Sequence, residues 1–166
     1  MNILKEITAA DMITLGNAIA GLVSILFSID QNFEMAAFFL VLAVLFDVID
    51  GKITRVCHCS GKLGKDLDSL ADVISFCVAP VVFAMMQIQN LFAFLAFIVF
   101  LCCGLLRLAR FNVLEFRHSY EGMPITLNGI IVPLIYLMRM PGFVYPIVYL
   151  VLGGLMISSF RIKKIF

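Results

Sequence analysis

The chain has 166 residues, of which 63% are hydrophobic and 14% are charged, and its mean hydropathy is +1.08. A soluble domain of this length could not keep so apolar a chain in water, so the composition excludes an ordinary soluble enzyme and predicts a protein embedded in a lipid bilayer. The formal net charge of +1 says nothing further about partners, and we expect no nucleic acid among them.

Six stretches have the apolar composition of membrane-spanning helices, which need about 20 residues to cross a hydrocarbon core of roughly 30 Å. They are residues 12–29, 34–56, the two halves of 73–106 on either side of a polar turn at 87–90, 123–138 and 140–160. The second stretch contains Asp47 and Asp50, and the fifth contains Asn128 and Pro133; such interruptions must face protein or water. We therefore expect one all-α membrane domain, residues 1–166, with six transmembrane helices preceded by a short interfacial helix at residues 1–11.

Basic residues are distributed unevenly between the two sides of this predicted bundle. With six spans, 11 of the 12 basic residues fall on the side that also holds both termini, and only Arg139 falls on the other. Lys and Arg in short loops are retained on the cytoplasmic side of a membrane. We expect both termini to be cytoplasmic.

Four aspartates gather at the predicted cytoplasmic mouth of the second and third spans. Asp47 and Asp50 are three residues apart, and Asp68 and Asp72 are four apart, so each pair shares one helix face. A hairpin between the pairs would bring four carboxylates together, and their repulsion would require either protons or a compensating cation. Hard oxygen ligands favour Mg²⁺, Mn²⁺ or Ca²⁺ over zinc. Two such cations can hold a diphosphate, so the cluster indicates phosphoryl transfer.

A divalent cation transporter would use the same acidic cluster and is the alternative from another functional class. Gly51 permits close approach of a ligand to its helix, and Arg55 can contact anionic oxygens. A transporter would need neither residue, so this neighbourhood favours the enzyme. Asp66 falls on another face from Asp68 and Asp72, and we interpret it as an interfacial helix cap.

The segment 47–72 reads D-x2-D-G-x2-T-R-x8-G-x3-D-x3-D. It resembles the signature of the CDP-alcohol phosphatidyltransferase family, in which Ala stands at the position of Thr54. The D, G and R positions of that signature are filled by Asp47, Asp50, Gly51, Arg55, Gly64, Asp68 and Asp72. The flanking segments 63–80, 104–112 and 122–124 are similar to the phosphatidylserine synthase branch of the family.

This resemblance implies a homodimer of six-helix protomers. From the distribution of basic residues, we expect a cell-membrane protein whose active site faces the cytoplasm. The resemblance also implies transfer of the phosphatidyl group from CDP-diacylglycerol, or from the archaeal ether analogue CDP-archaeol, to the hydroxyl of L-serine, with release of CMP. Two divalent cations, Mg²⁺ or Mn²⁺, would be held by the four aspartates, with Ca²⁺ as a non-productive occupant. Asp72 would also act as the general base. The CDP-lipid would be bound by Thr14, Asn17, Asp50, Gly51, Arg55, Gly61, Gly64 and Asp68.

The acceptor site is predicted near the cytoplasmic end of the fourth span. Arg107 and Arg110 lie there, followed by Asn112, and an arginine can bind the serine carboxylate in a bidentate fork. The arginines could instead anchor the helix at the membrane surface or neutralise the aspartates. Glycerol phosphate or inositol phosphate would be alternative acceptors, but their phosphate would favour a larger basic pocket. Asn17 has an alternative role as a hydrogen bond between helices.

Overall fold

The computed structural model describes residues 9–57, 62–113, 120–158 and 161–162. Its helices are α1 (Ala9–Ile29), α2 (Phe33–Cys57), α3 (Lys62–Asp72), α4 (Ala79–Gln87), α5 (Leu91–Val113), α6 (Asn128–Leu137) and α7 (Val144–Ile157). A π-helical turn, η2 (Val73–Val78), joins α3 and α4 into one rod, and a 3-10 turn, η3 (Ile125–Leu127), leads into α6. Two short strands, β1 (Tyr120–Glu121) and β2 (Arg161–Ile162), pair antiparallel.

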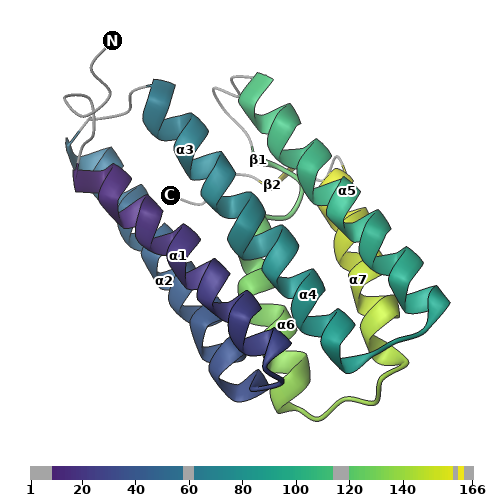
Figure 1. Cartoon of the computed structure of the whole chain (residues 1–166). Coiled ribbons are helices and arrows are strands. Elements are labelled where there is room, and N and C mark those ends of the chain that lie inside the picture. The colour runs from purple at the N-terminus through teal and green to yellow at the C-terminus, as the bar shows by residue number, and fades with distance from the viewer. Residues whose placement is uncertain (1–8, 58–61, 114–119, 159–160, 163–166) are drawn as a thin grey trace.

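When the α3–η2–α4 rod is taken as one element, the helices run alternately up and down in a single bundle (Figure 1). α1 packs mainly on α2, and α5 packs mainly on α7, with the α3–η2–α4 rod between these two pairs. We call the end of the bundle where α1 begins, α2 ends and α3 begins the site end. The connections from α1 to α2, from α4 to α5 and from α6 to α7 lie at the opposite end (Figure 1).

Asparagine caps fix two of the turns at the opposite end. The side chain of Asn32 accepts a hydrogen bond of 3.3 Å from the backbone N–H of Met35 and so begins α2. The side chain of Asn90 accepts one of 2.7 Å from the N–H of Ala93 and begins α5. The polar turn that the sequence predicts at residues 87–90 is confirmed, since α4 ends at Gln87 and α5 starts at Leu91.

Three helical stretches are long and apolar enough to cross a membrane: Asp11–Ile29, Leu63–Gln87 and Leu91–Val113. α2 has comparable length, with 25 residues, but carries the charges of Glu34, Asp47 and Asp50. Large apolar side chains point outward on these helices, as Leu22 and Leu95 do, with exposed fractions of 51% and 53%. Such a surface suits lipid rather than water.

The last two helices are shorter than the predicted spans 123–138 and 140–160. The apolar helical stretches there are Ile125–Leu137 and Val144–Ile157. Pro141 and Gly142 follow the end of α6, and this pair favours a turn over helix, so α7 begins only at Val144. The count of six spans and the cytoplasmic termini stay predictions. Of the predicted interfacial helix, residues 1–8 lie outside the described residues, and residues 9–11 belong to α1.

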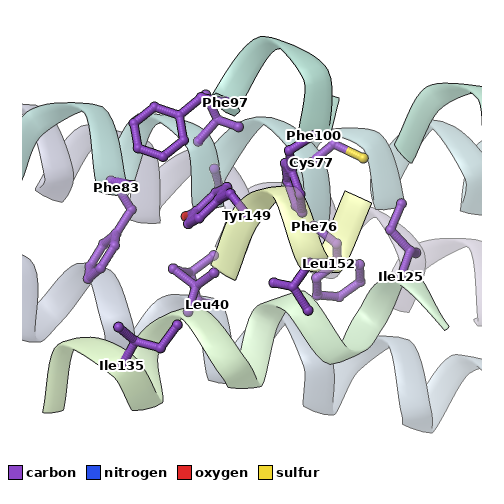
Figure 2. Close-up of a cluster of buried hydrophobic side chains, with 14 of the residues drawn as sticks. Leu40, Phe76, Cys77, Phe83, Phe97, Phe100, Ile125, Ile135, Tyr149 and Leu152 are labelled. Atoms are coloured by element: carbon purple, nitrogen blue, oxygen red, sulfur yellow. The ribbon is translucent and has the colours of Figure 1, made fainter. Parts of the chain in front are cut away.

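An aromatic cluster forms the centre of the core between α5, α7 and α4 (Figure 2). The ring of Tyr149 meets the rings of Phe97 and Phe100, each at a centroid distance of 4.8 Å and edge to face. The Tyr149 hydroxyl donates a hydrogen bond of 2.5 Å to the backbone carbonyl of Pro80. Gly153 of α7 faces Phe100 and Cys103 of α5, and a Cβ there would lie in ordinary contact, 3.5 Å from the Cα of Phe100. This packing holds α7 against the central rod.

Candidate active site

One face of α1 carries a stripe of small and polar residues that recur every three or four positions, which places them on one side of the helix. All are buried, and they are Asp11, Thr14, Asn17, Gly21, Ser24 and Ser28. Ser24 donates a hydrogen bond of 2.9 Å to the carbonyl of Ala36 on α2. A Cβ at Gly21 would overlap Ser75 of η2, so α1 and the central rod are in direct backbone contact. The stripe packs α1 tightly against both of its neighbours.

The acidic side chains of α2 and α3 converge at the site end, as their spacing predicts. Asp47, Asp50 and Asp68 each offer a carboxylate oxygen, and these oxygens all lie within 4.8 Å of one another. The carboxyl of Asp72 lies close enough to interact electrostatically with all three. Asp50 and Asp72 are buried, with exposed fractions of 5% and 7%.

This cluster fits divalent metal ions of the hard type. Its donors are all carboxylate oxygens, which suits Mg²⁺ or Mn²⁺. Among the described residues, one buried oxygen of Asp68 has no hydrogen-bond partner, and buried carboxylates seldom persist without compensation. A cation in reach of these oxygens would satisfy that atom and offset the repulsion between the aspartates.

Two polar side chains of α1 hold two of the aspartates. The hydroxyl of Thr14 donates a hydrogen bond of 2.5 Å to Asp50. The side-chain amide of Asn17 donates one of 3.4 Å to Asp72, which is a hydrogen bond between helices, as the alternative interpretation of Asn17 requires. The amide oxygen of Asn17 is buried and has no hydrogen-bond partner in the described part of the chain.

The π-helical turn η2 follows directly after Asp72. An extra residue in a helical turn rotates the following side chains by about 100°. The rod can therefore present Asp68 and Asp72 to the site in α3 and apolar side chains to the core in α4. Asn128 supports the widened turn, because its amide donates a hydrogen bond of 3.2 Å to the carbonyl of Phe76. Such π-turns are frequent at functional sites.

The predicted CDP-lipid residues differ in their surroundings. A Cβ at Gly51 would meet nothing within 4 Å, so this position is open to a ligand. Arg55 lies one turn further along α2 and donates a hydrogen bond of 2.8 Å to the Gly51 carbonyl. A Cβ at Gly64 would lie 2.9 Å from a carboxylate oxygen of Asp11, so Gly64 allows α3 to approach α1. Gly61 lies outside the described residues.

The predicted acceptor residues lie on α5, opposite α3. Arg107 is half-buried, interacts electrostatically with Asp72, and has a buried Nε without a hydrogen-bond partner among the described residues. Asn112 exchanges hydrogen bonds of 3.0 and 3.1 Å with Ser69, the residue after Asp68. Arg110 is exposed. The structure thus brings Arg107 and Asn112 to the α3 side of α5.

Three residues of the site were missed by the sequence interpretation. Asp11 is buried beside Gly64, and its offset of three residues from Thr14 could have placed it in the α1 stripe. Ser69 could have been found only as a neighbour of Asp68. Asn128 carries no local signal of its role, because its partner Phe76 is 52 residues away in the sequence.

Comparison with known proteins agrees with this geometry. Residues 7–158 match the CDP-alcohol phosphatidyltransferase family. The chain belongs to this family. It is therefore a membrane-associated transferase of phospholipid biosynthesis, and the cation-transporter alternative loses its support.

Several curated proteins whose names include serine are similar to this transferase. It is 32% identical over 163 residues to the CDP-diacylglycerol–serine O-phosphatidyltransferase of Methanocaldococcus jannaschii, covering 98% of this chain and 77% of that protein. It is 37% identical over 146 residues to the archaetidylserine synthase of Methanothermobacter thermautotrophicus, covering 80% of this chain and 61% of that protein. The corresponding Bacillus subtilis CDP-diacylglycerol–serine enzyme is 32% identical over 161 residues, covering 93% and 86% of the two chains.

Proposed function

We propose that this transferase moves the phosphatidyl group of CDP-diacylglycerol, or the equivalent group of CDP-archaeol, to the hydroxyl of L-serine and releases CMP. The names of the relatives support serine as the acceptor. The observation that carries the proposal is the position of Arg107, a half-buried cation with a free Nε that faces Asp72 from the neighbouring helix. An amino-acid carboxylate bound there would leave its hydroxyl near the acidic cluster.

Asp47, Asp50, Asp68 and Asp72 would hold two divalent cations, Mg²⁺ or Mn²⁺, while Ca²⁺ would occupy the site without supporting turnover. When bound, such cations neutralise negative charge on a diphosphate and on its leaving group. Thr14 fixes the orientation of Asp50 through its hydrogen bond, so that the carboxylate does not have to reorganise when the cation and substrate arrive.

Asp72 is the proposed general base. Asn17 donates to one of its carboxylate oxygens, and this leaves the other oxygen to accept the proton of the serine hydroxyl. The serine oxygen then forms a bond to the phosphorus that carries the lipid, and the bond from that phosphorus to the CMP oxygen breaks. Burial of Asp72 keeps bulk water from competing as the acceptor.

The nucleotide and diphosphate would lie along the open side of α2. Gly51 leaves room for the ligand, and Arg55 can turn its guanidinium toward phosphate oxygens while remaining near the Gly51 carbonyl. Asn17 offers its unpaired amide oxygen to a donor on the ligand. Gly61 and Gly64 complete the predicted set, and Gly64 acts by allowing α1 and α3 to close together.

In the acceptor site, Arg107 would bind the serine carboxylate, and Asn112 would be held in place by Ser69. Arg110 is exposed and would attract anionic substrate or lipid headgroups. We further propose six membrane spans with both termini and the site end in the cytoplasm, and a homodimer as the working unit. The uneven distribution of basic residues supports the orientation.

A panel of acceptors tests the proposal. The purified protein, with CDP-diacylglycerol and either Mg²⁺ or Mn²⁺, is offered L-serine, glycerol phosphate or inositol phosphate, and CMP release is measured. We expect turnover with serine, loss of turnover with a metal chelator, and little product with the two phosphates. Turnover with glycerol phosphate but not with serine would contradict the choice of acceptor. Absence of CDP binding in the presence of either metal would contradict the reaction class.

A further inference from the structure

A cavity lies at the end of the bundle opposite the aspartates and has a volume of about 610 Å³. Ligand pockets usually measure about 300–1,000 Å³, so it is large enough for a small polar group. Its polar lining consists of Glu34, Gln87, Tyr136, Arg139 and Tyr145. Glu34 precedes Asp47 by 13 residues on the same helix, which corresponds to about 20 Å along the axis. This cavity is therefore separate from the candidate active site.

The cavity presents one charge of each sign. Glu34 lies in the first turn of α2, and Arg139 follows the end of α6. Within the described residues, neither side chain forms an ion pair, although both line the same space. A ligand with one anionic and one cationic group would compensate both.

Arg139 has an unusual backbone conformation, with a φ of 49°. It occupies the left-handed position after α6, where the N–H of Met140 bonds to the carbonyl of Ile135 at 3.3 Å. Glycine or asparagine is usual at this position, because a larger side chain is strained there. A positive charge near a helix C-terminus is favourable, but an arginine anywhere in the last turn would provide this interaction without a strained backbone. Gln31 has a similar backbone conformation at the same end of the bundle, with a φ of 59°, so the strain alone assigns no use to the Arg139 side chain; its position on the cavity wall does.

The cavity walls are held in place by the protein itself. The hydroxyl of Tyr145 donates a hydrogen bond of 3.1 Å to Gln87, and the amide of Gln87 donates one of 2.9 Å to the carbonyl of Phe83. These bonds join the start of α7 to the end of α4. The ring of Tyr136 packs edge to face on Phe83 at 5.5 Å and also meets Phe33 at 5.9 Å. These walls are therefore formed before any ligand arrives, while the exposed side chains of Glu34 and Arg139 are free to turn toward it.

The rim of the cavity is apolar and faces outward. Leu137 and Met140 line it and are exposed by 67% and 37%. Phe143, beyond Met140, is exposed by 69%. Aromatic and apolar side chains beside polar ones are typical of the zone where a membrane meets water, at the depth of lipid headgroups.

We propose that this cavity binds the headgroup of a zwitterionic aminophospholipid. Its phosphate pairs with Arg139, its ammonium group pairs with Glu34, and its chains run out over Leu137 and Met140. A headgroup with one phosphate and one ammonium matches the charges of the cavity, whereas a purely anionic headgroup leaves Glu34 uncompensated. The apolar rim favours a lipid over a free phosphodiester. This inference does not depend on the proposed reaction, since no residue of the acidic cluster takes part.

Native mass spectrometry of the detergent-solubilised protein tests the proposal. Three probes are titrated: dihexanoyl phosphatidylethanolamine, dihexanoyl phosphatidylglycerol and glycerophosphoethanolamine. We expect the first to bind at one site with a Kd lower than the other two by about tenfold or more, as expected for a charge-assisted hydrogen bond. Equal binding of phosphatidylglycerol would overturn the proposed role of Glu34. Equal binding of glycerophosphoethanolamine would overturn the proposal that the ligand is a lipid rather than a free phosphodiester.

Arg139→Gly is the decisive variant, because it removes the guanidinium and also relieves the strained backbone. We expect it to keep or raise the melting temperature and to weaken phosphatidylethanolamine binding by about tenfold or more. Gln31→Gly is the matched control, since Gln31 lies at the same end and has a φ of 59°. It should gain thermal stability in the same way and bind the lipid as the unmodified protein does. Unchanged lipid binding in Arg139→Gly would overturn the proposal.

Glu34→Gln provides a second arm that leaves the backbone untouched. We expect it to remove the preference for phosphatidylethanolamine over phosphatidylglycerol while binding of the phosphate persists. A preserved preference in this variant would contradict the proposed pairing of Glu34 with the ammonium group.

Discussion

The two sides of the bundle are held together by different chemistry. On the α1–α2 side, buried hydroxyls and amides join the helices, and Thr14 and Asn17 hold aspartates of the acidic cluster. On the α5–α7 side, aromatic rings pack around Tyr149, whose hydroxyl bonds to the backbone of the central rod. The first arrangement fixes the direction of carboxylates, and the second fixes the distance between helices. Substitutions on the two sides should therefore separate catalysis from stability.

Asp72→Asn should have the largest effect on catalysis. The amide keeps the shape of the side chain but cannot take the proton of the acceptor hydroxyl, and loss of a general base typically lowers kcat by about 10²–10⁴-fold. CDP-lipid binding should be largely retained. CMP release and equilibrium binding of the CDP-lipid measure the two quantities.

Asp66→Asn is the matched control, since Asp66 is exposed on the same helix. It should turn over at the unmodified rate. A rate in Asp72→Asn close to that of this control would rule out Asp72 as the base.

Arg107→Lys should have the next largest effect on activity, and it should change the KM of one substrate only. Lysine keeps the charge but cannot form the bidentate fork with a carboxylate, so KM for serine should rise by about 10-fold or more while KM for the CDP-lipid stays constant. Arg110→Lys should change KM for serine less, because Arg110 is exposed. Equal increases for both substrates in Arg107→Lys would indicate that Arg107 serves mainly to neutralise Asp72.

Thr14→Val should have a smaller effect. Valine has nearly the same shape but lacks the hydroxyl that bonds to Asp50, and a hydrogen bond to a charged group contributes about 1.5–3 kcal/mol, so kcat/KM should fall by at least about tenfold. The metal concentration needed for half-maximal activity should rise as well.

Ser28→Ala is the control for this substitution. Ser28 belongs to the same α1 stripe but bonds at 2.8 Å to the carbonyl of Ser24, far from the aspartates. It should leave kcat/KM and the metal requirement unchanged. A comparable loss of activity in Ser28→Ala would mean that the stripe acts through helix packing alone.

The sequence predicted that the four aspartates converge, because this follows from helical periodicity: side chains three or four residues apart share a helix face. The positions of Asp47 and Asp50 on α2 and of Asp68 and Asp72 on α3 follow from that rule and from one hairpin. The helical class follows equally from composition. The roles of these residues, the span count and the membrane orientation stay predictions.

Other features depend on contacts that local patterns do not encode. The π-turn at Val73–Val78 is supported by Asn128, which lies on α6, so no window of sequence around Asp72 reveals it. The late start of α7 depends on Pro141 and Gly142. The mean hydropathy of residues 140–160 is high despite this pair, so hydropathy alone predicts a longer helix. The burial of Asp11 was not predicted, because a charged residue next to an apolar stretch is normally taken as the end of the membrane span.

Tyr149→Phe should have the smallest effect on catalysis and a clear effect on stability. It keeps both ring contacts but removes the side-chain donor to the buried carbonyl of Pro80, and such a hydrogen bond typically contributes about 0.5–1.5 kcal/mol. The melting temperature in detergent should fall, while kcat and both KM values persist at a permissive temperature. Tyr136→Phe is the control, because the Tyr136 hydroxyl has no hydrogen-bond partner among the described residues, and its melting temperature should change less. A fall in kcat without a fall in melting temperature would show that the aromatic side of the bundle also controls the aspartates, and the separation between the two sides would fail.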